Sequence, residues 1–70
     1  MEPKYKHILE TIKTQIIEEK YPAGSMLPDQ NTLAKEFKTS RMTVKKALDM
    51  LAIEGFIYSR RGSGTFVKKN

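Results

Sequence analysis

The sequence predicts a mainly α-helical domain that ends in a small antiparallel β-hairpin. Its first 54 residues contain three segments in which apolar residues recur every three or four positions, the pattern of amphipathic helices. After Gly55 the pattern changes to two short runs of β-branched and aromatic residues, separated by a turn with two glycines. Seventy residues suffice for one such domain with a modest core, so residues 1–70 are expected to form a single unit.

The first predicted helix runs from Lys4 to near Lys20. Residues at helical spacing give it one apolar face: Tyr5, Ile8, Leu9, Ile12 and Ile16. His7 falls outside this face and is expected to be an ordinary surface residue. Pro22 and Gly24 then interrupt the helix and are typical of a turn.

The second predicted helix is short and begins after Asp29, whose side chain is expected to cap it. Its inner face is predicted to consist of Leu33, Ala34 and Phe37. Met26 and Leu27, which precede it, are expected to form at most a very short strand. The helix is predicted to end near Lys38, so that only Lys38 and Thr39 connect it to the next one, as in a helix-turn-helix.

The third predicted helix begins at Ser40, whose hydroxyl can accept a hydrogen bond from a free backbone N–H of the first turn. Its buried face is predicted to consist of Val44, Ala47, Leu48 and Leu51. The helix is expected to end near Glu54, with Gly55 in the left-handed conformation that often follows a helix.

Two strands are predicted after that helix, Phe56–Ser59 and Thr65–Val67, with Arg60–Gly64 as the turn between them. Three helices followed by a hairpin, with the second and third helices closely joined, describe a winged helix-turn-helix. In that fold the third helix enters the major groove of DNA, and the hairpin, or wing, reaches the flanking backbone or the minor groove.

The positive charge of the chain is concentrated in its second half. Residues 35–70 contain nine basic and three acidic side chains, whereas residues 1–34 contain four and five. Such asymmetry favours a polyanionic partner. Arg41, Lys45 and Lys46 lie in the first turns of the third predicted helix, where the helix dipole favours anions. The sequence therefore predicts that this helix faces double-stranded DNA.

Three of the thirteen cations are arginines, Arg41, Arg60 and Arg61, and the arginine fork suits guanine edges and phosphates. Adjacent strand residues point to opposite faces, so a DNA contact is favoured for Arg61 over Arg60. Both could instead solubilise the hairpin edge. Met42 is equally compatible with a contact to a thymine methyl and with a partly buried filler. Lys46 and its lysine neighbours are expected to add electrostatic attraction.

The composition argues against several other classes of protein. The chain has no cysteine and one histidine, so we expect neither a disulfide framework nor a Cys- or His-based metal site. Nothing resembles a nucleophile–base pair or paired catalytic carboxylates, so no enzyme activity and no cofactor are expected. No apolar run approaches membrane-spanning length and no signal-peptide pattern is present, so the expected location is cytoplasmic, without a membrane partner.

Several motifs occur together at fixed spacing. They are Pro22-Ala23-Gly24 with Leu27-Pro28, Leu33-Ala34, Ser40-Arg41-Met42-Thr43-Val44-Lys45, Ala47-Leu48, Leu51, Glu54-Gly55 and Gly62-Ser63-Gly64-Thr65-Phe66-Val67. On these motifs the chain resembles the N-terminal DNA-binding domain of GntR-family bacterial transcription regulators over nearly its whole length. The family implies a repressor, less often an activator, that binds a palindromic operator as a dimer.

The resemblance also implies roles for particular residues. Contacts to bases and phosphates would be made by Ser40, Arg41, Thr43 and Lys45, and wing contacts by Arg61 and Gly62. The DNA contact that an arginine makes in the family would fall on Asn31, a weaker and uncharged donor. A lysine at position 45 in place of the commoner arginine favours a phosphate contact over guanine reading.

The same resemblance implies a further domain beyond residue 70. In the family, that C-terminal domain binds a small-molecule effector and usually mediates dimerisation, so the longer protein is expected to be a homodimer in which each domain reads one half-site. Two other functions stay open from the residues alone. A winged helix used for protein–protein contact would expose an apolar patch on the third helix. Non-specific DNA or RNA binding would use the same basic surface.

Overall fold

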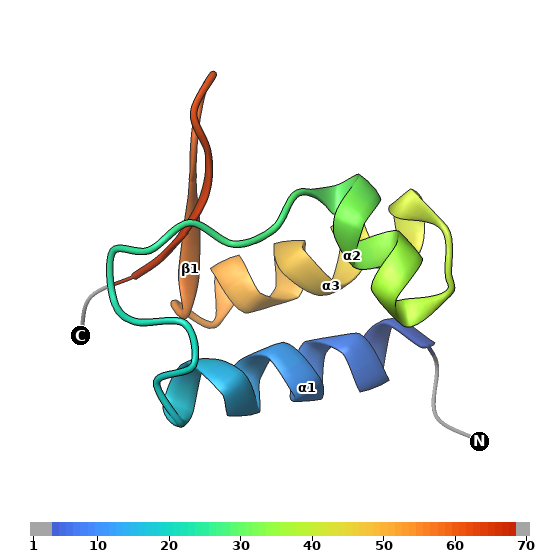
Figure 1. Ribbon diagram of the computed structural model, residues 1–70, viewed down its shortest axis with the longest axis horizontal. Helices are drawn as coiled ribbons and strands as arrows, with labels where there is room; N and C mark the ends of the chain where they lie inside the picture. The colour runs from blue at the N-terminus through green and yellow to red at the C-terminus, as the bar shows by residue number, and fades with distance from the viewer. Residues whose placement is uncertain (1–3, 69–70) are drawn as a thin grey trace.

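The computed structural model describes residues 4–68, which form three α-helices followed by a two-stranded antiparallel sheet (Figure 1). The elements are α1 (Lys4–Ile17), α2 (Gln30–Phe37), α3 (Arg41–Ile53), β1 (Ile57–Arg60) and β2 (Gly64–Val67). Their order confirms the predicted winged helix-turn-helix architecture. Residues 1–3 and 69–70 of the predicted domain lie outside the described residues. None of the helices described is long and apolar enough to cross a membrane.

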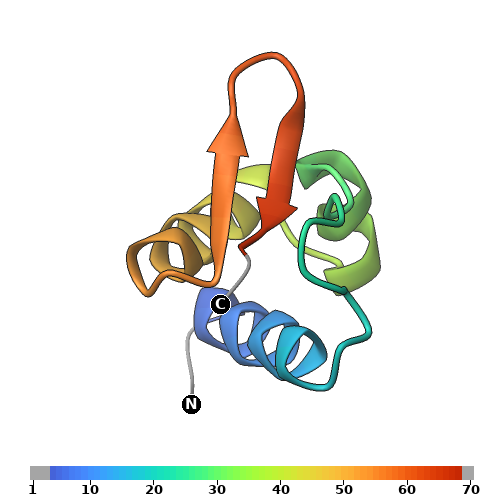
Figure 2. The same ribbon diagram turned by 90° about the vertical axis from the view of Figure 1, so that its left-hand side faces the viewer.

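Helix α3 is the central element, because it packs against α1, α2 and β1. The hairpin stands beside the helices and rises well beyond them, which is clear in two perpendicular views (Figures 1 and 2). The largest fully buried side chains come from all three helices and from β2: Ile8, Ile12, Leu33, Val44, Leu51 and Val67. Burial of each such side chain contributes roughly 1.5–3 kcal/mol.

The apolar face predicted for each helix is the face that packs inward. On α3 the buried residues are Val44, Ala47, Leu48 and Leu51, as predicted. On α1, Ile8, Leu9 and Ile12 are buried, and Tyr5 and Ile16 pack partly against the core. On α2, Leu33 and Ala34 are buried and Phe37 is half-buried. Because the inner face of α3 is fixed in this way, its opposite face is directed to solvent.

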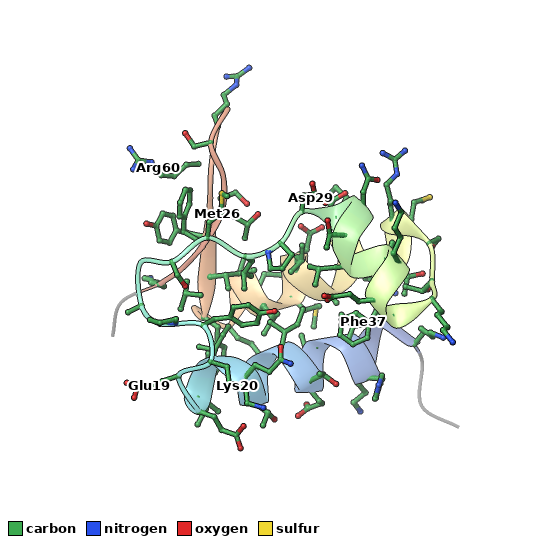
Figure 3. The ribbon with its side chains drawn as sticks, viewed as in Figure 1. Glu19, Lys20, Met26, Asp29, Phe37 and Arg60 are labelled. Carbon is green, nitrogen blue, oxygen red and sulfur yellow. The ribbon has the colours of Figure 1, made fainter. Side chains whose placement is uncertain are left out.

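The end of α1 was predicted about three residues too late. The helix ends at Ile17, and Glu19 adopts a left-handed φ of 63° (Figure 3). The N–H of Lys20 donates to the carbonyl of Gln15 (2.9 Å), and the N–H of Glu19 donates to the carbonyl of Ile16 (3.1 Å). This is the hydrogen-bond pattern of a Schellman motif, here without the usual glycine. The sequence therefore contains no glycine at this position that would have predicted the end of α1.

The ends of α2 and α3 agree with the predictions. Lys38, also left-handed with φ 53°, closes α2, and the N–H of Thr39 donates to the carbonyl of Ala34 (2.9 Å). After α3, Gly55 has φ 87° and the N–H of Phe56 donates to the carbonyl of Leu51 (3.0 Å). These two tight turns set the start of α3 against α2 and lead its end directly into the wing.

The strands of the wing differ by one residue from the predicted ranges: β1 is shifted by one residue, whereas β2 begins one residue earlier and ends at Val67 as predicted. Phe56 lies before β1, whereas Arg60 and Gly64 pair with each other at the turn end of the ladder. The expected short strand at Met26–Leu27 is a single bridge, in which Met26 pairs with Phe66. Main-chain hydrogen bonds on either side of that bridge tie the loop before α2 to β2 and so fix the wing against the helices.

Candidate nucleic-acid interface

Ser40 and Thr43 define the start of α3. The Oγ of Ser40 accepts a hydrogen bond from the backbone N–H of Thr43 (3.2 Å), which confirms the predicted N-cap. The two hydroxyl oxygens also lie 2.9 Å apart and share a hydrogen bond. Both hydroxyls are thus engaged in holding the first turn, and their contact with DNA stays a prediction.

Arg41 and Met42 lie at the exposed start of α3. Met42 is 82% exposed, and Arg41 is also exposed. The first turn contains no acidic residue, and none of the ion pairs within residues 4–68 involves Arg41. The positive end of the helix dipole and the guanidinium therefore act in the same direction, so this end of α3 attracts anions. The exposure of Met42 favours a surface contact over the filler interpretation.

The two lysines of α3 point to different sides. Lys45 Nζ lies 3.1 Å from Asp49 Oδ2 along the solvent-facing side of the helix. Lys46 Nζ lies 4.3 Å from the ring centroid of Tyr5, a cation–π contact with α1. The structure thus places Lys45 beside Arg41 and Met42 on the outer face and directs Lys46 toward α1.

A groove of about 550 Å³ lies between the start of α2, the start of α3 and the wing. Its lining consists of Met26, Leu27, Pro28, Asp29, Gln30, Asn31, Arg41, Leu48, Ser63, Gly64 and Thr65. The groove brings Asn31 and Arg41, both predicted site residues, to the same concave surface. Gln30 and Ser63 were not singled out from the sequence, because only the tertiary fold brings them together.

Asp29 forms one wall of this groove and orients α2. Its Oδ1 accepts a hydrogen bond from the backbone N–H of Thr32 (2.7 Å), which confirms the predicted cap (Figure 3). The hydrogen bonds from the backbone and side chain of Thr32 lower the pKa of the Asp29 carboxyl below its usual value of 3.8. A fixed negative charge therefore flanks Asn31, and the groove is not uniformly basic.

The two arginines of the wing occupy different positions. Arg60 is on the same face of β1 as Tyr58, whose ring stacks on Phe66 with centroids 5.8 Å apart. In Figure 3 the side chain of Arg60 points away from α2 and α3. Arg61 and Gly62 form the tip, where Gly62 has φ 78° and the N–H of Ser63 donates to the carbonyl of Arg60 (3.0 Å). The position at the tip therefore favours Arg61 over Arg60 for the predicted contact with DNA.

Within residues 4–68 no group of three His, Cys, Asp or Glu side chains could bind a metal ion. The interface consists instead of cations, amides, hydroxyls, the carboxylate of Asp29 and two exposed methionines, Met26 and Met42. The cations, amides and hydroxyls can donate hydrogen bonds to phosphates and to base edges, and the methionines can contact methyl groups. They provide what recognition of a nucleic acid requires.

Comparison with known proteins identifies relatives along almost the whole chain. A family model described as bacterial regulatory proteins, gntR family, matches residues 4–67. The HTH-type transcriptional regulator GmuR of Bacillus subtilis is 45% identical over 64 residues, which are 91% of this chain and 27% of GmuR. The HTH-type transcriptional repressor NagR of the same organism is 43% identical over 67 residues, 96% of this chain and 28% of NagR. The chain thus spans little more than a quarter of either relative.

Solved structures of similar sequence have the same fold. The DNA-binding domain of AraR in complex with an operator superposes with a TM-score of 0.92 at 39% identity, over 96% of this chain and 81% of that one. A regulator from Listeria monocytogenes gives a TM-score of 0.93 at 30% identity, over 99% of this chain and 60% of that one.

We predict that the stability of the domain depends on the ionisation of Asp29. Because the folded-state pKa is lowered, the cap contributes stability above about pH 3.8, and this contribution is lost as pH falls through the folded-state pKa. Asn also caps helices but does not titrate in this range. In Asp29→Asn the midpoint of denaturant unfolding should therefore fall less steeply than in the parent between about pH 5 and 2. Parallel curves for the two proteins would contradict the assignment.

Proposed function

The chain belongs to the GntR family of bacterial regulatory proteins, and on that basis we propose that it binds double-stranded DNA sequence-specifically as the operator-reading part of a transcriptional repressor. In this proposal α3 lies in the major groove and the wing lies on the flanking backbone or in the minor groove. The AraR structures with operator DNA support this role for the fold, at 39% identity.

The observation that carries the proposal is the exposed, acid-free first turn of α3. Arg41 and Met42 project from the helix end that attracts anions, and the inner face of the same helix is fully buried. A domain gains no stability from cations in that position unless an anion lies in front of them. The major groove is about 12 Å wide and admits one helix, and it presents phosphates at its edges and acceptors on its floor.

The positions of the predicted site residues support different proposed roles for them. Arg41 is proposed to contact a base edge, with Asn31 contacting the DNA backbone from the opposite side of the protein groove. Arg61 and Gly62 are proposed to approach DNA from the wing tip. Lys46, held over Tyr5, is proposed to contribute charge alone. Arg60, Lys35 and Lys38 are likewise proposed to contribute charge alone, because none of them lies in α3.

The proposal extends to a longer protein in the bacterial cytoplasm. GmuR and NagR are each more than three times as long as the matched segment. A following domain that binds a small-molecule effector and joins two copies would let two chains read a palindromic operator, one half-site each. No catalytic step and no cofactor form part of this proposal.

A protein–protein role is the main competing function, because α3 also exposes Met42, Met50 and Ile53. Met42 and Ile53 are eleven residues apart, which separates them by about 16 Å along the helix. The charged pair Lys45–Asp49 lies between them. Such an interrupted surface is not the contiguous apolar patch that marks a protein interface.

Selection of bound duplexes from a random pool tests the proposed function. We expect a recurring half-site, bound at least about a hundredfold more tightly than random duplex at the same salt concentration. This ratio is below the range of about a thousandfold or more for specific DNA-binding proteins, because a single domain reads one half-site. The logarithm of affinity should fall linearly with the logarithm of salt concentration, with a slope of about −0.9 per phosphate contacted. A pool without enrichment, or an affinity that does not respond to salt, would overturn sequence-specific DNA binding.

Arg41→Ala should weaken binding to the selected duplex by about 1–3 kcal/mol, because a base contact is lost. Lys20→Ala is the matched control, since Lys20 lies after α1, away from the first turn of α3 and from the wing tip (Figure 3). Fluorescence-anisotropy titrations of parent and variants against the same duplex measure both effects. Equal affinities for Arg41→Ala and Lys20→Ala would rule out the proposed role of Arg41.

A further inference from the structure

Asp49 is the one acidic residue of α3, and it lies on the face proposed to meet DNA. Its side chain is 62% exposed, and its Oδ2 is 3.1 Å from Nζ of Lys45, one helical turn earlier. A carboxylate at this place repels phosphates and neutralises Lys45, for which the family resemblance implies a DNA contact. Its presence therefore calls for a physical reason.

The stability of the helix does not provide that reason. Exposed ion pairs contribute little, and a lysine placed four residues before an acid is the less favourable order. Asp49 also lies in the second half of α3, whereas the helix dipole favours acids in the first turn. Glu54, the acidic residue that follows α3, has a structural role instead. Glu54 pairs with Lys13 of α1 at 3.1 Å and so joins two elements of the fold.

The pair has a direct effect on the direction of Lys45. A lysine side chain is flexible and ends in an ammonium with three N–H donors, without the rigid fork of arginine. Asp49 accepts one of these hydrogen bonds and leaves two donors free. The pair biases the ammonium toward the outer face of α3 and away from phosphates at the edges of the groove.

A lysine at position 45 without a partner favours phosphates. We propose that Asp49 is a positioning residue that sets specificity, by directing Lys45 toward base edges and withholding it from the phosphates of DNA that α3 does not fit. This inference rests on the proposed DNA-binding function. On a matching site the two free donors of Lys45 reach their acceptors while the ion pair persists. On other DNA the ammonium stays neutralised, so non-specific binding is weakened.

Asp49→Asn tests the proposal, with the 70-residue chain, a duplex selected by the parent and a random duplex of equal length. Affinity for the random duplex should rise about threefold to fivefold and its salt slope should steepen by about one phosphate contact, because Lys45 is released. Affinity for the selected duplex should stay the same or fall. The ratio of the two affinities should therefore fall by at least about threefold.

Three further variants separate positioning from general charge. Glu54→Gln removes an equal charge elsewhere and should change both affinities by the same factor, whereas Asp49→Glu, which keeps a carboxylate one turn from Lys45, should preserve the parent ratio. In a Lys45→Met background, Asp49→Asn should leave the ratio unchanged. The inference would be overturned if Asp49→Asn and Glu54→Gln had the same ratio of selected-duplex to random-duplex affinity. It would also be overturned if Asp49→Asn lowered this ratio as much in the Lys45→Met background as in the parent. A parent without preference for any duplex would instead overturn the proposed function itself.

Discussion

Burial of one face of α3 is the constraint on which the rest of the structure depends. Val44, Ala47 and Leu51 are completely buried, and α1, α2 and β1 all pack around this face. Rotation of α3 by one residue, about 100°, would carry charged side chains into the core, and a buried unpaired charge costs several kcal/mol. The outward direction of Arg41, Met42 and Lys45 is therefore a consequence of packing.

The caps determine where α2 and α3 begin, and both helix starts belong to the surface proposed to contact DNA. Ser40 starts α3 and Asp29 starts α2, and both helix starts border one groove together with the wing. The bridge between Met26 and Phe66 ties the wing to the loop before α2 and so places the wing beside the two helix starts. We propose that the cations at the start of α3, together with the carboxylate one turn after Lys45, discriminate among DNA sequences from this surface.

The sequence predicted the parts of the fold that depend on local patterns. Apolar spacing identified the helices, and side-chain caps and Gly55 located three of their ends. The end of α1 was missed because Glu19 takes a conformation that glycine usually provides. The groove and the contact of Lys46 with Tyr5 depend on tertiary packing, so no local pattern could reveal them.

The outer face of α3, the start of α2 and the wing tip are proposed to act together on DNA. Titration of isotope-labelled chain with a selected duplex, followed by backbone amide chemical shifts, tests this most directly. The largest changes are expected at Asn31, in residues 41–45 and in residues 61–65, with residues 11–20 of α1 and its following turn almost unaffected. Changes centred on the opposite surface, around Lys13 and Glu54, would contradict the account.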